Sequence, residues 1–591
     1  VKGNSNYGVY SSGGMITATD CDITMTGTGS GRNDNFGIYS TLQEGSTGGT
    51  ATANGCTIII NGTYSAGVLA VTDGQAMSAD EYAVTVADSA IVVNFYENTL
   101  SSSGISTEGG NIQLNGGVSV NSQGLGITAR TGSINIASGT ASVTTLRGTG
   151  VYVNNGTLTV NEVATLSVQS TMTENSWVNP PGVSGNVVTH YDGIVVEGGS
   201  LVSNGTLNVE FTGVANTTTD YDYTNFETRS YAVRVEGGKG TSVLINKGTI
   251  TNDKGGGLYV NSSDSWSIGE QNIKDLTFEG ISAQDATKVE LKAVDISTTG
   301  TGTVSTKNIQ SNWNYNLYTE GGPAVKVNQG VLRIAGGTYT AKSGDGIRVQ
   351  GGVAFVEGGY FVGRDYTGNS DAYLPGAGAS YAFKVFGGHA KVTGGVFGRI
   401  SENETTGQGN GAFVMGGTAY ITKADIQAGG TTAFSVWTNA NVTFNGTNED
   451  IQVIGDSTGL AIETGGTNPA LSVTINGGTF KGTDKSNTNT NGIWYGNSNA
   501  QLTITNGYFE GARRSGLRMD VEPSWDWDNV QLSGGTFLTT QGSGYNAISA
   551  DRDFGYSRIL ETGARAYSGG NDLSNRNVND GNGRYTNITI G

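Results

Sequence analysis

The sequence predicts an all-β fold, a right-handed parallel β-helix (a solenoid) of roughly 18–20 coils with loop insertions at one corner. Three observations lead to this fold: one short phrase recurs along all 591 residues, glycine is in excess, and many short runs alternate apolar with polar residues. We expect residues 1–591 to form a single elongated β-helix, with a less regular stretch at 261–322 and a terminal segment at 551–591.

The recurring phrase is a small residue followed by an apolar one, and each copy marks the start of a coil. The copies begin at Gly8, Gly37, Gly67, Gly104, Gly126, Gly150, Gly193, Ala232, Gly257, Ala324, Gly346, Ala382, Ala412, Ala433, Gly459, Gly492, Gly516 and Ala547. The shortest intervals are about 21 residues, which holds two or three short strands but no helix in addition. The long interval from Gly257 to Ala324 is expected to hide one or two irregular coils.

A second motif follows many anchors: a strand of period two, a Gly-Gly turn, and a short strand that carries an aromatic residue. The clearest copies end at Tyr339, Phe361, Phe397 and Phe480. Alternation predicts strands, and glycine allows the positive φ of tight turns. Leucine-rich repeats would need regular leucines and an Asn ladder, and propeller blades would need ~40 residues each. The right hand follows from the general preference of parallel crossovers.

Composition narrows the possible partners. The chain has 96 glycines, and its 32 basic and 50 acidic residues give a net charge of −18. Nucleic acid is excluded as a partner, since binding phosphates needs a basic surface. No apolar run is long enough to span a membrane, which takes about 20 residues. Glycans and surface proteins of a host or neighbouring cell remain the expected partners.

The longer coils carry their extra residues after the aromatic strand and before the next anchor, in Thr171–Tyr191, Ala215–Tyr231, Gly363–Tyr381 and Arg399–Gly411. Loops on a rigid scaffold often bind ligands. Aromatic rings stack on sugars while neighbouring polar groups bond the hydroxyls. The candidate ligand-binding residues in these loops are Trp177, Tyr191, Tyr221, Tyr223 and Tyr366. Alternatively, the rings fold inward and pin each loop.

A second aromatic cluster lies late in the chain. Its candidate binding residues are Trp494, Arg513, Trp525 and Trp527. Because Gly492 and Gly516 are successive anchors, we expect Trp494 and Arg518 to be stacked neighbours in a shallow ligand patch. The alternative is a local structural plug.

No catalytic, metal or cofactor site is expected. Asp192 and Asp345 stand in Asp-Gly-Ile steps that resemble those of β-helix polysaccharidases, but they are several coils apart, and Asp also caps turns. The carboxylates at 551–553 have no visible partner for a two-carboxylate site. The two histidines, His190 and His389, lack the partners that zinc requires.

The two cysteines, Cys21 and Cys56, occupy equivalent repeat positions one coil apart. Stacked residues in adjacent coils are ~4.8 Å apart, within the Cα range of a disulfide. We therefore expect the two to be neighbours and a candidate disulfide. A buried pair of free thiols is the alternative, because oxidation depends on the compartment.

The Gly-Gly-Thr-Phe coils resemble those of bacterial surface adhesins, especially large cell-wall proteins of Gram-positive gut bacteria. The segments 156–160 and 243–251 resemble autotransporter passenger domains. The resemblance spans nearly the whole chain and implies a non-catalytic adhesin or stalk module, secreted or on the bacterial cell surface. Two alternatives stay open: a polysaccharide-degrading enzyme or tailspike-like depolymerase, and a structural filament subunit that associates end to end. We expect the chain to be a mature or excised piece of a longer protein.

Overall fold

The computed structural model describes these residues: 5–27, 34–42, 49–72, 77–78, 81–94, 102–146, 148–171, 192–212, 231–253, 255–264, 267–269, 271–299, 304–308, 314–318, 322–342, 344–364, 380–399, 410–429, 431–463, 471–486, 489–497, 499–520, 529–540, 547–550, 565–568, 571–572 and 587–590. The chain divides into two compact units. The N-terminal unit comprises Val1–Trp266, Ile281–Gly322 and Gln329–Leu332. The C-terminal unit comprises Ser267–Gly280, Pro323–Asn328 and Arg333–Gly591. The division falls within β28 (Val331–Ile334).

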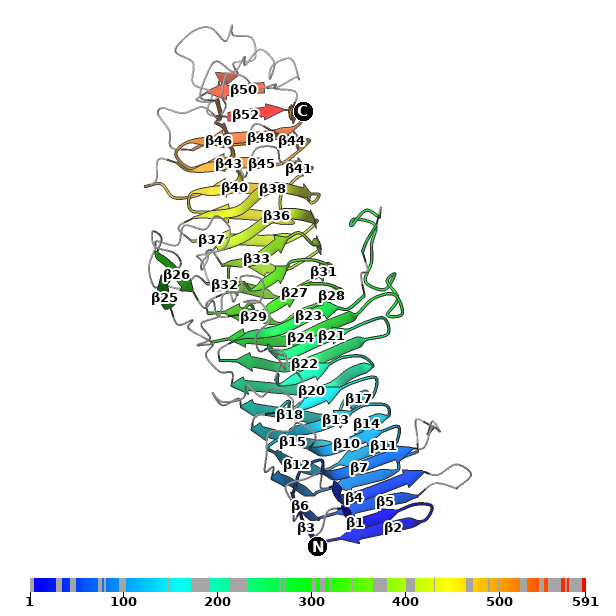
Figure 1. Cartoon of the computed structure of the whole chain (residues 1–591). Helices are drawn as coiled ribbons and strands as arrows, with labels where there is room; N and C mark the ends of the chain where they lie inside the picture. The colour runs from blue at the N-terminus through cyan, green and yellow to red at the C-terminus, as the bar shows by residue number, and fades with distance from the viewer. Residues whose placement is uncertain are drawn as a thin grey trace. The chain divides into compact units, whose positions relative to one another are not determined.

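Each of the first six coils of the N-terminal unit contributes one strand to each of three parallel sheets (Figure 1). The first sheet contains β1 (Ser5–Ser11), β4 (Asp34–Leu42), β7 (Ala66–Thr72), β10 (Ser103–Glu108), β13 (Leu125–Ala129), β16 (Val151–Val153), β19 (Ile194–Val196), β21 (Tyr231–Gly237) and β23 (Gly256–Ser262). The second contains β2 (Met15–Thr19), β5 (Thr50–Asn54), β8 (Val84–Ala87), β11 (Asn111–Asn115), β14 (Ser133–Ile136) and β17 (Thr157–Val160). The third contains β3 (Asp22–Thr26), β6 (Thr57–Asn61), β9 (Ala90–Asn94), β12 (Gly117–Ser122), β15 (Gly139–Leu146) and β18 (Ala164–Thr171). Three longer strands run from the second sheet into the third: β20 (Ser200–Thr212), β22 (Ser242–Asn252) and β24 (Lys288–Thr298).

The C-terminal unit repeats this arrangement. Its first sheet contains β27 (Val325–Val327), β30 (Ile347–Val349), β33 (Tyr381–Phe386), β40 (Thr458–Ile462), β43 (Asn491–Tyr495), β46 (Ser515–Met519) and β49 (Ile548–Ala550). Two strands run from the first sheet into the second, β36 (Asn410–Ile421) and β38 (Thr432–Phe444). The second sheet also has β31 (Val353–Val356), β34 (His389–Val392), β41 (Leu471–Ile475), β44 (Ala500–Ile504) and β47 (Val530–Leu532). The third has β29 (Thr338–Ala341), β32 (Tyr360–Gly363), β35 (Val396–Phe397), β37 (Ala424–Ala428), β39 (Ile451–Gly455), β42 (Thr479–Gly482), β45 (Tyr508–Gly511) and β48 (Gly535–Thr539).

The fold is a parallel β-helix, as the sequence predicts. Each unit has nine first-sheet strands among its described residues, and the predicted anchors lie in these strands or directly before them. The predicted position of one anchor is wrong by one residue. Ala412 pairs with Phe383 and with Phe434, so the residue equivalent to Ala433 is Gly411 rather than Ala412.

The anchors are small because the interior leaves no room for a side chain. A Cβ atom on Gly67 would lie 2.3 Å from Cγ2 of Ile91, in the third sheet of the same coil. It would also lie 2.7 Å from the carbonyl oxygen of Gly104, the anchor of the next coil. The opposing β-branched side chain already fills the space, as interiors packed to crystal-like density require.

The Gly-Gly-x-aromatic motif has a related cause. Gly478 has φ +117, and a Cβ there would lie 3.1 Å from Cε2 of Phe480 and from Cβ of Ile451. The second glycine therefore makes the turn and leaves space for the ring two residues later. The buried rings of Phe480, Phe509 and Phe537 then stack at centroid distances of 5.4 and 4.8 Å. Such aromatic pairs stabilise beyond the area they bury.

Some first-sheet strands, such as β21 and β23, are buried on both faces, in contrast to β1 with its exposed Tyr7 and Tyr10. In β21 and β23 the first five residues are all buried, whereas β5 and β17 alternate between buried and half-exposed residues. A parallel sheet covered on both faces reads as a continuous apolar run. This explains why the anchors, which belong to the first sheet, give the strongest repeat signal.

The long connections lie at two corners of the coil. As predicted, residues 172–191, 213–230, 365–379 and 400–409 connect a third-sheet strand to the next first-sheet strand. Residues 464–470 and 521–528 instead follow first-sheet strands.

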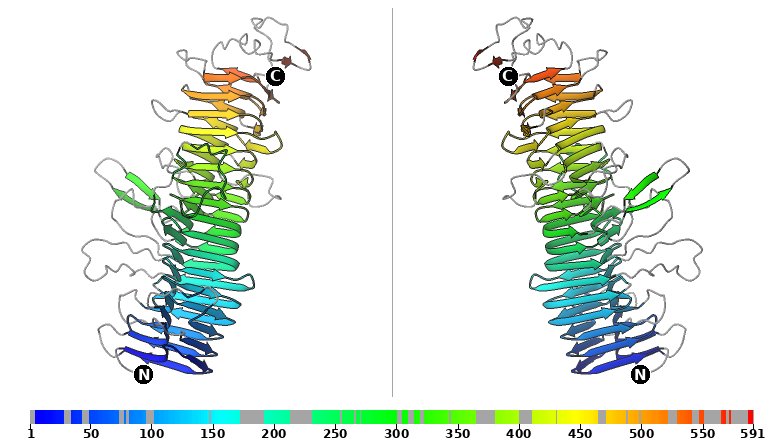
Figure 2. Two further views of the ribbon diagram at one scale, coloured as in Figure 1. Left: turned by 90° about the vertical axis from the view of Figure 1, so that its right-hand side faces the viewer. Right: turned by 90° about the vertical axis from the view of Figure 1, so that its left-hand side faces the viewer.

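The interval from Gly257 to Ala324 contains no further first-sheet strand among its described residues, so the expected hidden coil is not found there. It holds β24 and a separate antiparallel hairpin, β25 (Val304–Asn308) with β26 (Asn314–Tyr318), drawn in green in Figure 2.

The last third-sheet strand has an antiparallel neighbour. β52 (Asn587–Ile590) pairs with β48 and with β50 (Arg565–Ser568), which also pairs with β51 (Asn571–Asp572). An antiparallel strand at this position covers an edge that would otherwise template further pairing. Within the described part of the chain, no helix has the length and apolar character needed to cross a membrane.

Candidate functional site

Most of the predicted ligand-binding residues lie outside the described residues. These are Trp177, Tyr191, Tyr221, Tyr223, Tyr366, Trp525 and Trp527. Trp494 and Arg513 are described, and the candidate site is built around the first of them.

Trp494 lies on β43, in the first sheet of the C-terminal unit, and is half-exposed. It pairs in register with Arg518 of β46, so the two are the stacked neighbours that the anchor spacing predicts. The indole Nε1–H donates a 2.7 Å hydrogen bond to Oδ2 of Asp520. Nε of Arg518 donates a second bond, also 2.7 Å, to Oδ1 of the same carboxylate. Asp520 thus fixes both side chains.

Gly496 forms the floor under the indole ring. A Cβ atom at this position would lie 3.1 Å from Cζ2 and 3.2 Å from Cε2 of Trp494. The ring therefore rests against bare backbone, and its orientation is set by Gly496 and Asp520 together. A ring held in this way loses little conformational entropy when a ligand stacks on it.

Glu463 lies at the same edge of the first sheet, one coil before Gly496, and its carboxylate is hydrogen-bonded with Ser435 of the preceding coil. Glu463 directly follows Ile462, the last residue of β40. Ile462 pairs with Tyr495 of β43, and Tyr495 pairs with Met519 of β46. Glu463, Gly496 and Asp520 are therefore aligned at the ends of three successive strands. Burial raises the pKa of Glu463, and a hydrogen bond with Ser435 acts in the opposite direction. We call Glu463, Trp494, Gly496, Arg518 and Asp520 the Trp494 platform.

The Trp494 platform can bind a ring-shaped polar ligand. An indole face packs against the C–H groups of a pyranose, and flanking carboxylate and guanidinium groups bond hydroxyls. The charge of Asp520 is balanced by Arg518 at 2.7 Å. With Glu463 included, the platform holds two carboxylates and one guanidinium.

Arg513 precedes β46, whereas Asp520 follows that strand. Its backbone N–H donates to Oγ1 of Thr490 at 2.6 Å, and its guanidinium donates to the carbonyl oxygen of Ser486 at 3.1 Å. Arg513 therefore braces the segment that leads into β43.

A second aromatic surface, which the sequence analysis missed, lies on β1 and β4. Tyr7 and Tyr10 are 46% and 45% exposed. Their rings pack with those of Phe36 and Tyr39 at centroid distances of 5.1–5.7 Å. Burial raises the pKa of Tyr39. The signal was present in the sequence, because Tyr10 and Tyr39 end the first two anchor phrases.

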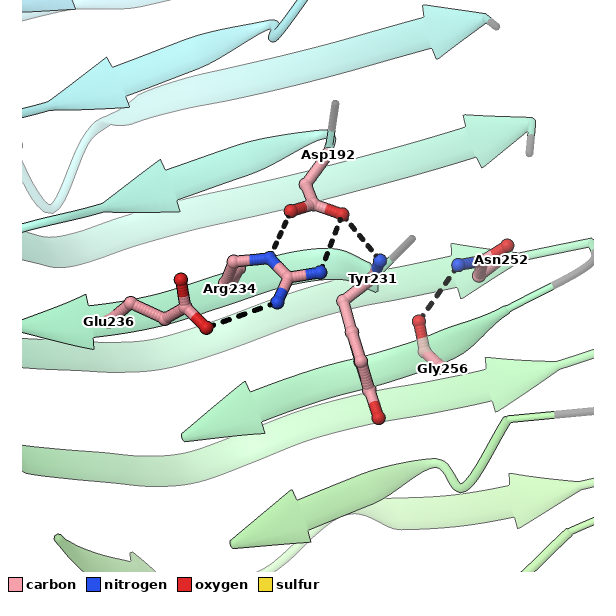
Figure 3. Close-up of polar contacts among 6 residues, drawn as sticks. All are labelled: Asp192, Tyr231, Arg234, Glu236, Asn252 and Gly256. Atoms are coloured by element: carbon pink, nitrogen blue, oxygen red, sulfur yellow. Dashed lines mark hydrogen bonds and ion pairs between the residues drawn. The ribbon is translucent and has the colours of Figure 1, made fainter. Parts of the chain in front are cut away.

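The Asp-Gly-Ile aspartates are structural. Asp192 is fully buried, and its Oδ1 accepts the backbone N–H of Tyr231 at 2.6 Å (Figure 3). It also binds the guanidinium of Arg234, which is 1% exposed. Asp345 is equally buried and accepts the backbone N–H of Tyr381 at 2.8 Å. Each aspartate thus holds the first residue of the strand that follows a long insertion, and its buried carboxylate is already engaged in this contact.

Arg234 is held by more than its carboxylate. Its Cζ lies 5.3 Å from the ring centroid of Tyr231 and 5.2 Å from that of Tyr259, and the two rings stack at 4.9 Å. A further ion pair with Glu236 measures 3.2 Å. Burial opposes the charge on Arg234, but Asp192 outweighs it, so the pKa of the guanidinium lies above its ordinary value.

The remaining chemical candidates are the two histidines and the carboxylates at 551–553. His190 and residues 551–553 lie outside the described residues. Burial lowers the pKa of His389. Among the described residues, no group of three or more His, Cys, Asp or Glu side chains could hold a metal ion.

Cys21 and Cys56 lie at the corner between the second and third sheets of the first two coils. Their Sγ atoms are 3.1 Å apart, and both are free thiols in this structure.

Comparison with known proteins gives no match to a family model, to a curated protein or to a solved structure. The parallel β-helix therefore rests on the geometry of this chain alone.

Proposed function

We propose that this chain is a non-catalytic, extracellular surface module that binds glycans and serves as an adhesin or stalk of a bacterial cell. The observation that supports it best is the Trp494 platform, an indole ring held by Gly496 and Asp520 on the first sheet. The extracellular, bacterial setting rests on the resemblance of the Gly-Gly-Thr-Phe coils to surface adhesins.

The electrostatics favour neutral or weakly cationic sugars. Asp520 is neutralised by Arg518, and the raised pKa of Glu463 disfavours its charged form. The net charge of −18 repels strongly acidic polysaccharides at low salt. Amino sugars and neutral hexoses are therefore the expected ligands.

A glycan array probed with the full chain tests the proposal, followed by calorimetry on each hit. Trp494→Ala should weaken binding at least tenfold, since an aromatic contact contributes about 0.5–1.5 kcal/mol beyond its buried area. Tyr420→Ala is the matched control. It removes a half-exposed aromatic of the second sheet, whose hydroxyl accepts a 2.9 Å bond from Asn445, and should leave binding unchanged. Equal binding by wild type and Trp494→Ala would overturn the assignment of the site.

A depolymerase is the second candidate, and the carboxylate pair favours it. Glu463 and Asp520 follow β40 and β46, with β43 between them, so two coil spacings put their Cα atoms about 10 Å apart. Inverting glycosidases hold their two carboxyl groups roughly 6.5–9.5 Å apart. A raised pKa suits Glu463 as a general acid. Against this role, both carboxylate oxygens of Asp520 already accept hydrogen bonds. Release of reducing ends from an array hit, abolished by Glu463→Gln, would favour the enzyme over the adhesin.

A further inference from the structure

The cysteine pair is aligned by the backbone of two adjacent coils. Asp22 and Thr57, the residues that follow the two cysteines, pair in register, and the backbone N–H of Thr57 donates to the carbonyl oxygen of Cys21 at 2.9 Å. Stacked positions are ~4.8 Å apart at Cα, inside the 4.4–6.8 Å range that a disulfide spans. Oxidation therefore needs no rearrangement of the coils.

The geometry favours a covalent bond over a shared metal ion. Two thiolates on one zinc, each at about 2.3 Å, would stand roughly 3.7 Å apart in a tetrahedral site. The Sγ atoms of Cys21 and Cys56 are closer than this, at 3.1 Å. Among the described residues, no third and fourth ligand completes a metal site around them.

The cysteine pair lies between the first and the second coil, so a disulfide would join these two coils. In the described part of the chain, the strands β1, β2 and β3 each pair on one side only, with β4, β5 and β6. Met15 and Ile16 of β2 are 84% and 36% exposed. A cross-link between two adjacent coils opposes the local opening of either one.

We propose that Cys21 and Cys56 are a redox-controlled staple that a small disulfide, such as oxidised glutathione, closes to fasten the first coil to the second. The thiolate of half-exposed Cys21 attacks the small disulfide, releases one small thiol and forms a mixed disulfide. The thiol of buried Cys56 loses its proton to solvent and displaces the second small thiol from Cys21. One small disulfide thus becomes two small thiols, and the protein gains one disulfide.

The environment sets the speed of this reaction. The hydrogen bond with Cys56, followed by desolvation, raises the pKa of Cys21 to about 11. Because the thiolate is the attacking species, closure is slow at neutral pH and should accelerate about tenfold per pH unit below the pKa. The staple is therefore stable once formed and reluctant to form without a catalyst of exchange.

A serine in the next coil provides a conservative replacement. Ser89 occupies the equivalent position in the third coil, where it is buried, and its Oγ accepts the backbone N–H of Cys56 at 3.1 Å. The variants Cys21→Ser and Cys56→Ser should therefore keep the coils folded while removing the staple.

The test uses the full chain, incubated with oxidised glutathione between pH 7 and 10. We expect free thiols to fall from two to none, a tryptic peptide pair two hydrogens lighter than the reduced pair, and a rate that rises with pH. Thermolysin should then cut the first coil roughly tenfold more slowly than in dithiothreitol, because the cross-link opposes its opening. Either serine variant should show equal cleavage rates in both conditions.

Three results would overturn the proposal. One is two free thiols that persist after oxidation at pH 10. Another is glutathione retained on Cys21 without resolution by Cys56. The third is a disulfide that joins separate chains. All three are read on the wild-type protein, so they do not depend on whether a variant folds.

Discussion

The carboxylate of Asp192 accepts the backbone N–H of Tyr231 at 2.6 Å, although residues 213–230 separate the preceding strand from Tyr231. The same carboxylate neutralises Arg234 in a site closed to water. The first residue after a long insertion is thereby held at the start of β21. After an insertion the chain must return to the register of the stacked coils, and this hydrogen bond helps to fix that register at Tyr231.

Replacing this aspartate should destabilise the N-terminal unit. Asp192→Ala removes the buried carboxylate that pairs with Arg234 and leaves the guanidinium with the half-buried Glu236, so we expect a loss of about 3–5 kcal/mol in the free energy of unfolding. Asp192→Asn keeps an acceptor for Tyr231 and should cost less. Urea denaturation followed by circular dichroism measures both. The control is Glu210→Ala on the exposed side of β20, expected within about 0.5 kcal/mol of wild type. A neutral Asp192→Ala would contradict a structural role.

The floor of the Trp494 platform can be tested separately from its ring. Gly496→Ala introduces a Cβ that would lie 3.1 Å from the indole, so the ring must shift by a few tenths of an ångström. We expect glycan binding to weaken by roughly threefold to tenfold, about 0.7–1.4 kcal/mol, while the fold is kept. Calorimetry on an array hit measures the change. If binding were lost in Trp494→Ala but untouched in Gly496→Ala, the ring would matter and its exact position would not.

Glu463 should make stability depend on pH in a specific direction. Burial raises its pKa in the folded chain above the ordinary value of 4.5. Between the two pKa values the folded state binds more protons than the unfolded state. Stability from this group is therefore present in acid and declines as pH rises through the unfolded pKa and then the folded one. Glu463→Gln should flatten that decline, as measured by urea midpoints from pH 4 to 8. A urea midpoint that rises from pH 4 to 8 in the wild type, but not in Glu463→Gln, would contradict this prediction.

The turn glycine before each stacked ring should tolerate no side chain. Gly478→Ala places a Cβ 3.1 Å from both Ile451 and Phe480, at φ +117. Clash and backbone strain together should cost about 2–4 kcal/mol. Gly14→Ala is the control, because a Cβ there meets nothing within 4 Å. Thermal unfolding of the two variants should therefore separate them clearly, and similar melting would show that the aromatic ladder can move aside.

The coils can be predicted from the sequence because the two steric requirements that shape them act between nearby residues of one coil. An anchor such as Gly67 must be small opposite Ile91, and Gly478 must be glycine before Phe480, so each coil repeats the same letters. The error at Ala412 has the same origin. Gly411 and Ala412 are both small, and only the pairing of Phe383 with Ala412 decides between them.

The site could be predicted only in part. The spacing of Gly492 and Gly516 brings Trp494 beside Arg518, because register follows from the anchors. The roles of Gly496 and Asp520 depend on how one indole ring turns, and no periodicity encodes that. The contacts of Asp192 with Tyr231 and Arg234 could not be predicted for a similar reason. Tyr231 lies beyond an insertion whose length follows no repeat, so counting residues could not connect the two.

The fit between Gly67 and Ile91 joins two strands of one and the same coil, as does the equivalent fit between Gly37 and Ile58. A coil therefore carries both halves of its own steric match. Gene duplication or deletion of a whole coil would leave each remaining match intact. The length of such a protein can thus change in single-coil steps over evolutionary time, or at the bench, without redesign of its core.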